Sequence, residues 1–343
     1  MKINRQVKNN EVQENNGYLS LCYHYVHSRK NNEQFSKILG TDTQEFCRNL
    51  KMLCEEYDII SLNEARSFSY DNLSLRDNSY GMLITFDDGL ADHYAAARIL
   101  AKQGIKAVFF IPTCVLIEKL PANPTIIHYC LAKYKINDFL KVYRNALEEC
   151  GLDNGAYNIN FRKSEDDPWE AIKIIKALFK YKLKYQDSRK VLIFIYRALL
   201  LKDYSNCLEM MHLQQEQIHD IIAMGHSIGV HSHSHISIAA TELSTVEFQK
   251  EMIEPRLYLQ KVFGQEIFAF SYPYGGAQDC LANQELSRRD SGYQLAFTVE
   301  EIVNTKSTSP YELGRYMLNS QDSAVMLKKK LNEIKSTQKA CLI

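Results

Sequence analysis

The chain has 343 residues, of which 45% are hydrophobic, and this length allows one large α/β domain or two ordinary ones. Its 41 Lys and Arg residues balance 41 Asp and Glu residues, which argues against electrostatic binding to nucleic acid or to an acidic membrane surface. The expected partner is therefore a small or neutral molecule.

The opening stretch and the apolar runs of the sequence lead us to expect neither a secretory signal nor membrane insertion. Its first stretch, MKINRQVKNNEVQENNGY, is polar, and the most apolar run, 191–201, is interrupted by Arg197 and is shorter than the roughly 20 residues of a spanning helix. We therefore expect no transmembrane segment, a cytoplasmic location, and a flexible tail at 1–16. The nine cysteines form no CxxC pair and are expected to stay reduced.

Strands and helices alternate along the first 113 residues. Apolar strands are predicted within 18–26, 58–60, 81–89 and 106–112. Helical spacing is present in 43–57, after the capping-box pair Ser61 and Glu64, and in 91–104, which ends on a glycine. This alternation is typical of a parallel sheet or barrel with helices outside.

The pattern changes between 114 and 206, where helical stretches such as 138–150 and 168–183 follow one another without a strand. We interpret 114–206 as a helical insertion that forms a lid or a substrate-binding wall, because chain leaving the carboxyl end of a barrel strand emerges on the catalytic face. Simple packing or oligomerisation is the alternative.

The alternation resumes at 207. A helix and a strand are predicted within 213–235, followed by a helix at 244–264 that Pro255 should kink or split. Further strands are predicted within 267–276, 293–299 and 311–318, with a helix around 284–292. A C-terminal helix and tail are expected at 321–343.

The motif TFDDG places Asp87 and Asp88 at the end of an apolar strand. Adjacent carboxylates at a strand end point in different directions, so one can bind a metal while the other accepts a proton from water. An ordinary Asp-Asp-Gly turn or helix cap is the alternative.

The motif HSHSH contains His231, His233 and His235. In an extended segment all three would share one face, whereas a helical turn would bring His231 and His235 together and direct His233 away. Zinc, iron, nickel and cobalt accept imidazole together with carboxylate. A solvated polar loop is the alternative.

The motif SYPYGG predicts a strand end that bends sharply, because Pro273 fixes one dihedral and the glycines allow a close backbone approach. Exposed backbone N–H groups in such a bend can stabilise an oxyanion. An ordinary turn is the alternative.

The order of the three motifs, TFDDG, then H-S-x-x-H, then x-x-P-Y-G, resembles that of the polysaccharide deacetylases, also called the NodB-homology family. The resemblance covers roughly 18–113 and 207–318, and LCYHYV is similar to the first strand of the branch that deacetylates poly-N-acetylglucosamine. It implies an α/β fold, a distorted barrel of about seven parallel strands at 17–113 and 207–320. It also implies one divalent metal ion, with zinc ahead of iron, nickel or cobalt, and an N-acetylated sugar as substrate.

The resemblance also implies roles for single residues. Asp87 matches the catalytic base, and the matched metal ligands are Asp88, His231 and His235. The backbone N–H of Tyr274 would stabilise the oxyanion. The substrate-binding candidates are Tyr272, Pro273 and Tyr274.

The chain departs from the family pattern at two positions. Ser271 stands where the family has an arginine that pairs with the base, so Arg315 is expected to supply that charge or else to be a surface cation. No histidine follows His235 to protonate the leaving amine, so His24 is the candidate, with a structural role as the alternative. The other histidines are expected to be structural: His27, His93, His128, His212, His219 and His226.

The sequence therefore predicts a carbohydrate N-deacetylase that acts on nucleotide- or lipid-linked sugar precursors in preference to finished polymer. Two alternatives are a relative that hydrolyses cyclic amides and a catalytically silent carbohydrate-binding protein. Bound metal together with acetate release would identify the deacetylase.

Overall fold

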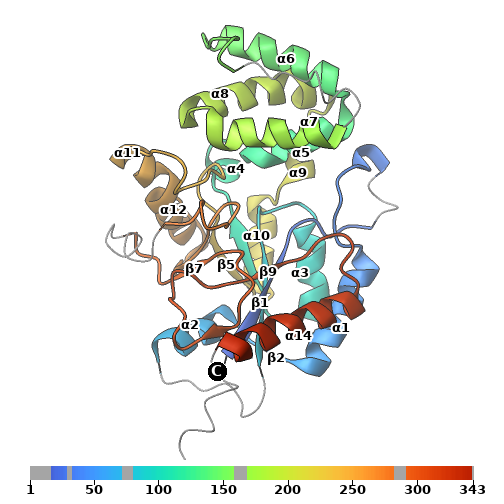
Figure 1. Ribbon diagram of the computed structural model, residues 1–343, viewed down its shortest axis with the longest axis vertical. Coiled ribbons are helices and arrows are strands. Elements are labelled where there is room, and N and C mark those ends of the chain that lie inside the picture. Colours follow the sequence, from blue (N-terminus) through green and yellow to red (C-terminus); the bar gives the residue numbers. More distant parts are fainter. Residues whose placement is uncertain (1–16, 29–32, 72–79, 158–167, 282–290, 342–343) are drawn as a thin grey trace, which may run out of the picture.

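The computed structural model describes residues 17–28, 33–71, 80–157, 168–281 and 291–341. The expected tail at 1–16 and most of the expected helix around 284–292 lie outside these residues. Figure 1 shows a barrel with surrounding helices in its lower part and a stack of helices above it.

The strands of the described residues form one sheet with the order β7-β6-β5-β4-β3-β1-β8, in which β2 also pairs with β3 and β9 with β1. All pairs are parallel except β1 with β8. The strands are β1 (Gly17–Tyr23), β2 (Asp58–Ile59), β3 (Gly81–Phe86), β4 (Val108–Ile111), β5 (Ser227–Val230), β6 (Ala269–Ser271), β7 (Leu295–Phe297), β8 (Asn304–Thr305) and β9 (Tyr316–Met317).

The predicted α/β barrel is confirmed. One strand, β8, differs from the prediction of parallel strands, because it runs antiparallel to β1. Strand β8 runs antiparallel because the chain leaves β7 at its carboxyl end and must return before β9 can run parallel to β1. Leu313 then bridges to Phe297 of β7, and Tyr316 pairs with Leu21 of β1. The segment 313–317 thus joins the two sides of the sheet and closes the barrel.

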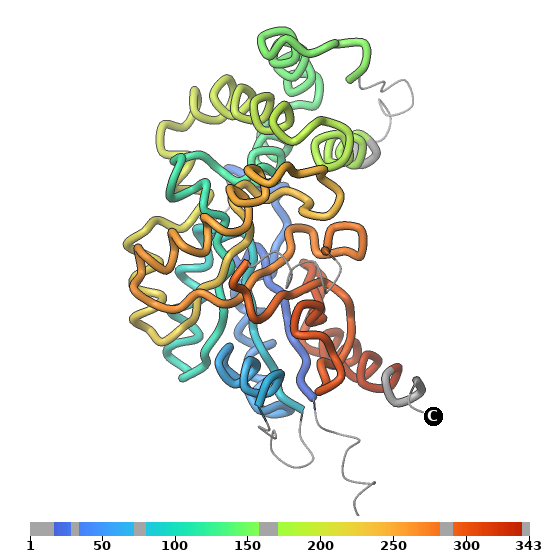
Figure 2. The backbone as a smooth tube through the Cα atoms, turned by 90° about the vertical axis from the view of Figure 1, so that its left-hand side faces the viewer, coloured from blue at the N-terminus to red at the C-terminus, as the bar shows by residue number. Residues whose placement is uncertain are grey.

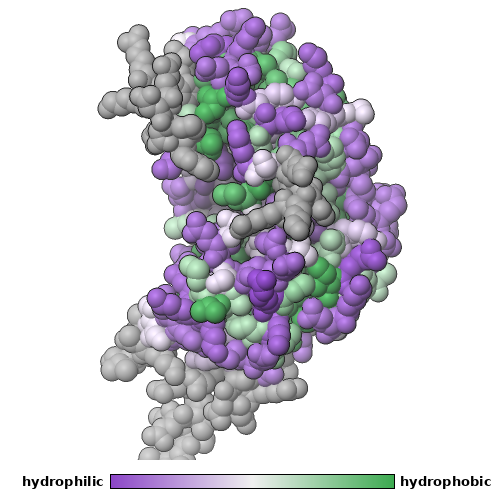
Figure 3. Space-filling view, turned by 90° about the vertical axis from the view of Figure 1, so that its right-hand side faces the viewer, coloured by the Kyte–Doolittle hydropathy of each residue, from purple (hydrophilic) through white to green (hydrophobic). Residues whose placement is uncertain are grey.

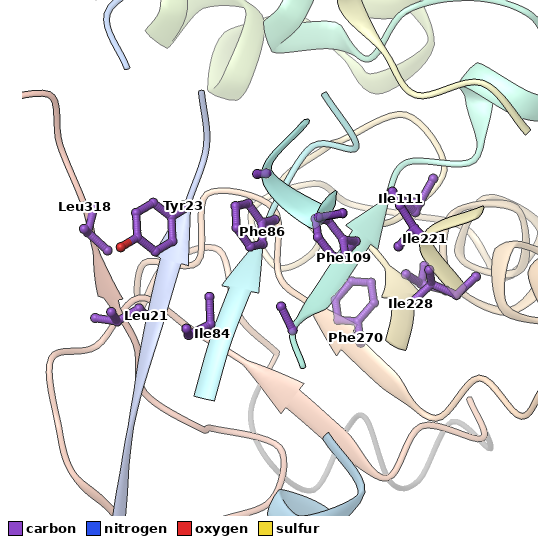
Figure 4. Packing of buried hydrophobic residues seen from close by; sticks show 14 of the residues in the cluster. Leu21, Tyr23, Ile84, Phe86, Phe109, Ile111, Ile221, Ile228, Phe270 and Leu318 are labelled. Atoms are coloured by element: carbon purple, nitrogen blue, oxygen red, sulfur yellow. The ribbon is translucent and has the colours of Figure 1, made fainter. Parts of the chain in front are cut away.

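Side chains alternate between the inside and the outside of the barrel, as the period of two in a strand requires. The outer set includes Tyr23, Phe86 and Phe109, whose rings stack along adjacent strands, with the last two centroids 4.7 Å apart (Figure 4). This set packs against helices, and the enclosed apolar surface forms the main hydrophobic core. The helices around the barrel are α1 (Thr43–Glu56), α3 (His93–Lys102), α10 (Gln215–Ala223), α12 (Glu254–Phe263) and α14 (Ala324–Cys341).

The inner set changes from apolar to polar along the strands. At the amino end, Tyr18 and Leu83 pack with Phe68 of α2 (Leu62–Tyr70), which covers that end of the barrel. Two residues after Leu83, the inward side chain is Thr85, and two residues after that, just past the end of β3, it is Asp87. The polar functional groups therefore gather at the carboxyl ends, where parallel barrels carry their active sites.

The chain between 114 and 211 is helical, and no strand lies within its described residues. Figure 2 shows these helices stacked at one end of the barrel, with a hydrophobic cluster of their own that also takes in Phe35 and Ile38. The boundaries 114–206 for the insertion stay a prediction. The elements are α4 (Cys114–Ile117), α5 (Asn123–Lys133), α6 (Ile136–Glu149), α7 (Pro168–Ala177), η3 (Leu178–Lys182), α8 (Tyr185–Tyr196), η4 (Arg197–Leu201) and α9 (Cys207–Met211), with a short 3₁₀ turn, η2 (Glu33–Phe35), nearby.

The helix predicted at 244–264 is split, as Pro255 led us to expect. A first turn, α11 (Thr245–Phe248), passes into a π-helical turn, η5 (Gln249–Ile253), and α12 begins one residue before Pro255. The wide turn arises where proline lacks the N–H of a regular helical bond.

Hydrophilic side chains cover most of the face shown in Figure 3, with smaller apolar patches between them. Within the described ranges, no helix is long and apolar enough to cross a membrane.

Candidate active site

Asp87 follows β3, is 3% exposed and points into the barrel. Its Oδ1 accepts a hydrogen bond from Arg315 Nη1 at 2.9 Å, and its Oδ2 accepts one from Arg315 Nη2 at 2.8 Å. Oδ2 also accepts from Ser271 Oγ at 2.9 Å and from Cys22 Sγ at 3.3 Å. Strands from both halves of the chain therefore position one carboxylate.

Arg315 is completely buried and uses all five of its N–H donors. Besides the two bonds to Asp87, it donates to Thr298 O at 2.9 Å, Thr85 Oγ1 at 3.0 Å and Ser271 Oγ at 2.8 Å. Burial alone would raise the pKa of Asp87, but the Arg315 guanidinium lowers that pKa well below the usual range of a carboxyl group. Asp87 is therefore ionised and fixed in orientation.

Asp88 turns away from Asp87 toward two histidines. Its Oδ1 lies 3.3 Å from His231 Nε2 and 3.0 Å from His235 Nε2, and all three side chains are buried. Among the described residues this oxygen accepts no hydrogen bond. One ligand atom from each of these three residues lies within 4.8 Å of the other two.

This group fits a metal ion. Zinc binds histidine nitrogen and carboxylate oxygen at about 2.0–2.1 Å, which in a tetrahedral arrangement separates the ligand atoms by about 3.3 Å. The distances from Asp88 Oδ1 to the two imidazole nitrogens are close to that value. A buried oxygen without a donor is also costly unless a cation neutralises it.

His231 is oriented by a neighbouring strand. It continues β5 on the inward side, where Gly229 leaves room for Phe110, since a Cβ at Gly229 would come within 2.5 Å of that ring. The Nδ1 of His231 bonds to Ser271 O at 2.8 Å, which directs Nε2 toward Asp88. An oriented imidazole of this kind is typical of metal ligands.

The loop after β5 brings His231 and His235 together and directs His233 away, the second of the two arrangements that the sequence allowed. The ring centroids of His231 and His235 are 4.6 Å apart, whereas His233 bonds to Thr113 Oγ1 and Glu118 Oε1, both at 3.0 Å. The loop is not the helical turn that would also bring the two rings together. Instead, left-handed backbone conformations at Ser232 and His235 bring them together.

Left-handed backbone conformations gather at the site. Non-glycine residues with positive φ include Asp88 (75°), Ser232 (55°), His235 (63°) and Tyr274 (65°). For an L-residue this conformation costs roughly 1–2 kcal/mol, and such strain is often found at functional sites. At Asp88 it reverses the strand alternation, so that neighbouring carboxylates both reach the site.

His24 follows β1 on the inward side and is partly exposed. Its Nδ1 lies 3.9 Å from Cys22 Sγ, and one atom each from Cys22, His24 and Asp87 lie within 4.8 Å of one another. The structure thus places His24 beside the buried carboxylate.

The three residues of the SYPYGG motif differ in position. Tyr272 is 1% exposed and packs edge-on against Phe270 on the outer side of the barrel, because Ser271 occupies the inward position. Its ring therefore lies in the core, on the opposite side from Ser271 and Asp87, where a substrate contact was expected. Pro273 is buried, and the partly exposed Tyr274 packs edge-on against His235 with centroids 4.7 Å apart.

Sequence reasoning missed several residues around these groups. Ser271 was noted only as the place of a missing arginine, yet it bonds to both Asp87 and Arg315. Cys22 could have been found, since it lies two residues before His24 and thus on the same face. Glu251, which accepts bonds from the histidine loop, has no motif that would have shown it.

Two histidines expected to be structural, His212 and His226, are buried and bond to backbone atoms. His226 accepts a hydrogen bond from Ala107 N and bonds to Ala97 O, and burial lowers its pKa. His212 accepts from Ala122 N and bonds to Asp88 O, and burial lowers its pKa to about 4. Both rings have a partner for each nitrogen in the neutral form.

Comparison with known proteins finds a family-model match over part of the chain. Residues 174–294 match the family model described as polysaccharide deacetylase, a stretch that includes HSHSH and SYPYGG but begins after TFDDG. No curated protein sequence matches the chain significantly.

Several solved structures share the fold. The Streptococcus pyogenes deacetylase PplD in complex with acetate has 17% sequence identity and a TM-score of 0.55, with 92% of this chain and 98% of that chain covered. A de-N-acetylase from Aggregatibacter actinomycetemcomitans has 13% identity and a TM-score of 0.52, with 92% and 99% covered. IcaB from Ammonifex degensii has 16% identity and a TM-score of 0.50, with 92% and 97% covered. At these identities the likeness establishes the barrel fold.

Proposed function

We propose that the chain, whose residues 174–294 match the polysaccharide deacetylase family model, is a carbohydrate deacetylase that uses one divalent metal ion to remove an N-acetyl group from an N-acetylated sugar. The observation that carries the proposal is the convergence of Asp88, His231 and His235 beside a separately paired Asp87. The relative solved in complex with acetate agrees with acetate as the product.

Asp88, His231 and His235 would hold the ion through one carboxylate oxygen and two imidazole nitrogens. Zinc is the expected ion, and iron, nickel and cobalt accept the same ligands. When bound, the ion polarises the amide carbonyl and lowers the pKa of a coordinated water molecule.

The chain's own residues would then move protons and stabilise charge. Asp87 accepts the proton of the attacking water, and Arg315 keeps this carboxylate ionised and oriented. The backbone N–H of Tyr274, which has no acceptor among the described residues, donates to the oxygen on which negative charge develops. His24 donates a proton to the nitrogen as the C–N bond breaks, which gives acetate and a free amine.

We propose a compact amino-sugar substrate, such as a nucleotide- or lipid-linked precursor. Lys180 of η3 lies 3.9 Å from the centroid of the Tyr274 ring, and Tyr185 of α8 bonds to Glu251 behind the histidine loop. The helices thus enclose the site on one side, which favours a short substrate over an extended polymer.

The test measures metal content and acetate release on the purified full chain, with N-acetylated nucleotide sugars and oligosaccharides as substrates. Asp87→Asn should lower turnover by about 10²–10⁴-fold while the metal stays bound, because it removes the proton acceptor but no metal ligand. Asp88→Asn should lose the metal. Loss of metal in Asp87→Asn would mean that the two aspartates exchange roles, and metal without acetate release from any substrate would favour a binding protein.

A further inference from the structure

The histidine loop is held from behind by one buried carboxylate, that of Glu251 in η5. Its Oε2 accepts hydrogen bonds from His233 N at 3.0 Å and Ser234 N at 2.9 Å. Its Oε1 accepts from Ser234 Oγ at 2.7 Å and Tyr185 OH at 2.6 Å. Glu251 is completely buried, so these four donors replace its contacts with water.

The bonds to Glu251 lie at the part of the loop that sets the spacing of the two histidine ligands. Ser232 and His235 have positive φ, and the amides that Glu251 fixes belong to the two residues between them. Ser232 Oγ also accepts from His235 N at 2.9 Å, which closes the turn. Without Glu251, these two amides would lack an acceptor and the chain could return to less strained conformations.

The insertion contributes one of the four donors, because Tyr185 is the first residue of α8. One turn later, Arg189 bonds to Glu118 Oε2 at 2.9 Å, and Glu118 Oε1 lies 3.0 Å from His233 Nε2. Residues four apart share a helix face, so one side of α8 reaches the histidine loop by two routes.

We propose that Glu251 is a positioning residue for the metal site and that Tyr185 couples the insertion to it. On this basis the insertion helps to set metal affinity, in addition to any role in enclosing the substrate. The inference rests on the proposed function, since it assumes that His231 and His235 bind a metal ion. It concerns metal affinity and not the chemical step.

Tyr185→Phe is the central variant, because it removes the hydroxyl bonded to Glu251 and keeps the ring. Tyr134→Phe is a matched control, since Tyr134 OH makes the same kind of bond to Asp203 Oδ2 at 2.7 Å, within the insertion. Glu251→Gln neutralises the carboxylate with little change of shape. Each variant is made in the full chain.

The measurement is the dissociation constant for Zn²⁺, from competition with a chromophoric chelator, together with the visible spectrum of the Co²⁺ form. Outer partners of metal ligands commonly change metal affinity by about 10–100-fold. We expect roughly tenfold weaker binding or more in Glu251→Gln, several-fold weaker binding in Tyr185→Phe, and no change in Tyr134→Phe. At saturating metal, kcat of Tyr185→Phe should return to the wild-type value.

The outcomes separate this inference from the proposed function. The inference would be overturned if Tyr185→Phe and Tyr134→Phe changed the Zn²⁺ dissociation constant equally. It would also be overturned if neither Tyr185→Phe nor Glu251→Gln changed it. In both cases metal binding by the wild-type chain would leave the proposed function intact. A wild-type chain that binds no metal would overturn both. If Glu251→Gln does not fold, the comparison of the two tyrosine variants decides.

Discussion

Replacing Arg315 with methionine should destabilise the protein far more than an ordinary salt-bridge mutation does. The guanidinium is completely buried and donates five hydrogen bonds, two of them to Asp87. Its removal leaves a buried carboxylate without its cation, and losing one partner of a buried pair typically costs about 3–5 kcal/mol. Urea denaturation at pH 7 measures this loss as a shift of the midpoint at constant m-value.

Two further variants make the measurement specific. Glu301→Gln removes a partly exposed surface pair with Lys330 and should change the free energy of unfolding by no more than about 1 kcal/mol. The double variant Arg315→Met/Asp87→Leu removes both buried charges and should be more stable than Arg315→Met alone. A loss in Arg315→Met no larger than that in Glu301→Gln, or no recovery in the double variant, would refute the inference that the pair is strongly coupled.

Three other changes test separate parts of the structure. His24→Gln should lower kcat by about 10²-fold or more with unchanged metal content, because it removes the proposed proton donor; unchanged kcat would exclude this role. Lys180→Met should reduce kcat/KM by roughly two-fold or more in the acetate-release assay, because it removes both a cation–π contact to the Tyr274 ring, worth about 0.5–2 kcal/mol, and the 2.9 Å ion pair to the buried Asp279; an unchanged value would show that neither contact matters for turnover. Because the pKa of His226 is lowered in the folded state, the unfolded chain binds a proton at this residue more readily. The contribution of His226 to the free energy of unfolding should therefore be complete above about pH 6.5 and decline as the pH falls below that value. His226→Asn should flatten that decline in urea denaturation, and an identical slope would count against it.

The sequence predicts those parts of the site that depend on local pattern. Strand periodicity and the turn after TFDDG place Asp87 and Asp88 at a carboxyl edge, and the spacing within HSHSH allows His231 and His235 to meet. The structure shows both arrangements, although the left-handed backbone at Asp88 and His235 could not be read from the residue types, because most Asp and His residues have negative φ.

Contacts between distant segments could not be predicted in the same way. Arg315 and Asp87 are 228 positions apart, and their pairing depends on how the barrel closes. The sequence therefore left Arg315 open between a partner of the base and a surface cation. Tyr272 was expected to contact the substrate because of its motif, but the inward position of Ser271 sends its neighbour to the opposite side.

The closure of the barrel has a consequence for biosynthesis. Strand β1 leaves the ribosome long before β9, its parallel neighbour, which is made almost 300 residues later. The guanidinium that neutralises Asp87 belongs to the segment next to β9, so a nascent chain carries an uncompensated acidic group in an open barrel until residue 315 has been made. Pairing over such long sequence separations is slow, and the exposed edges of the unfinished barrel are where chaperones would be needed.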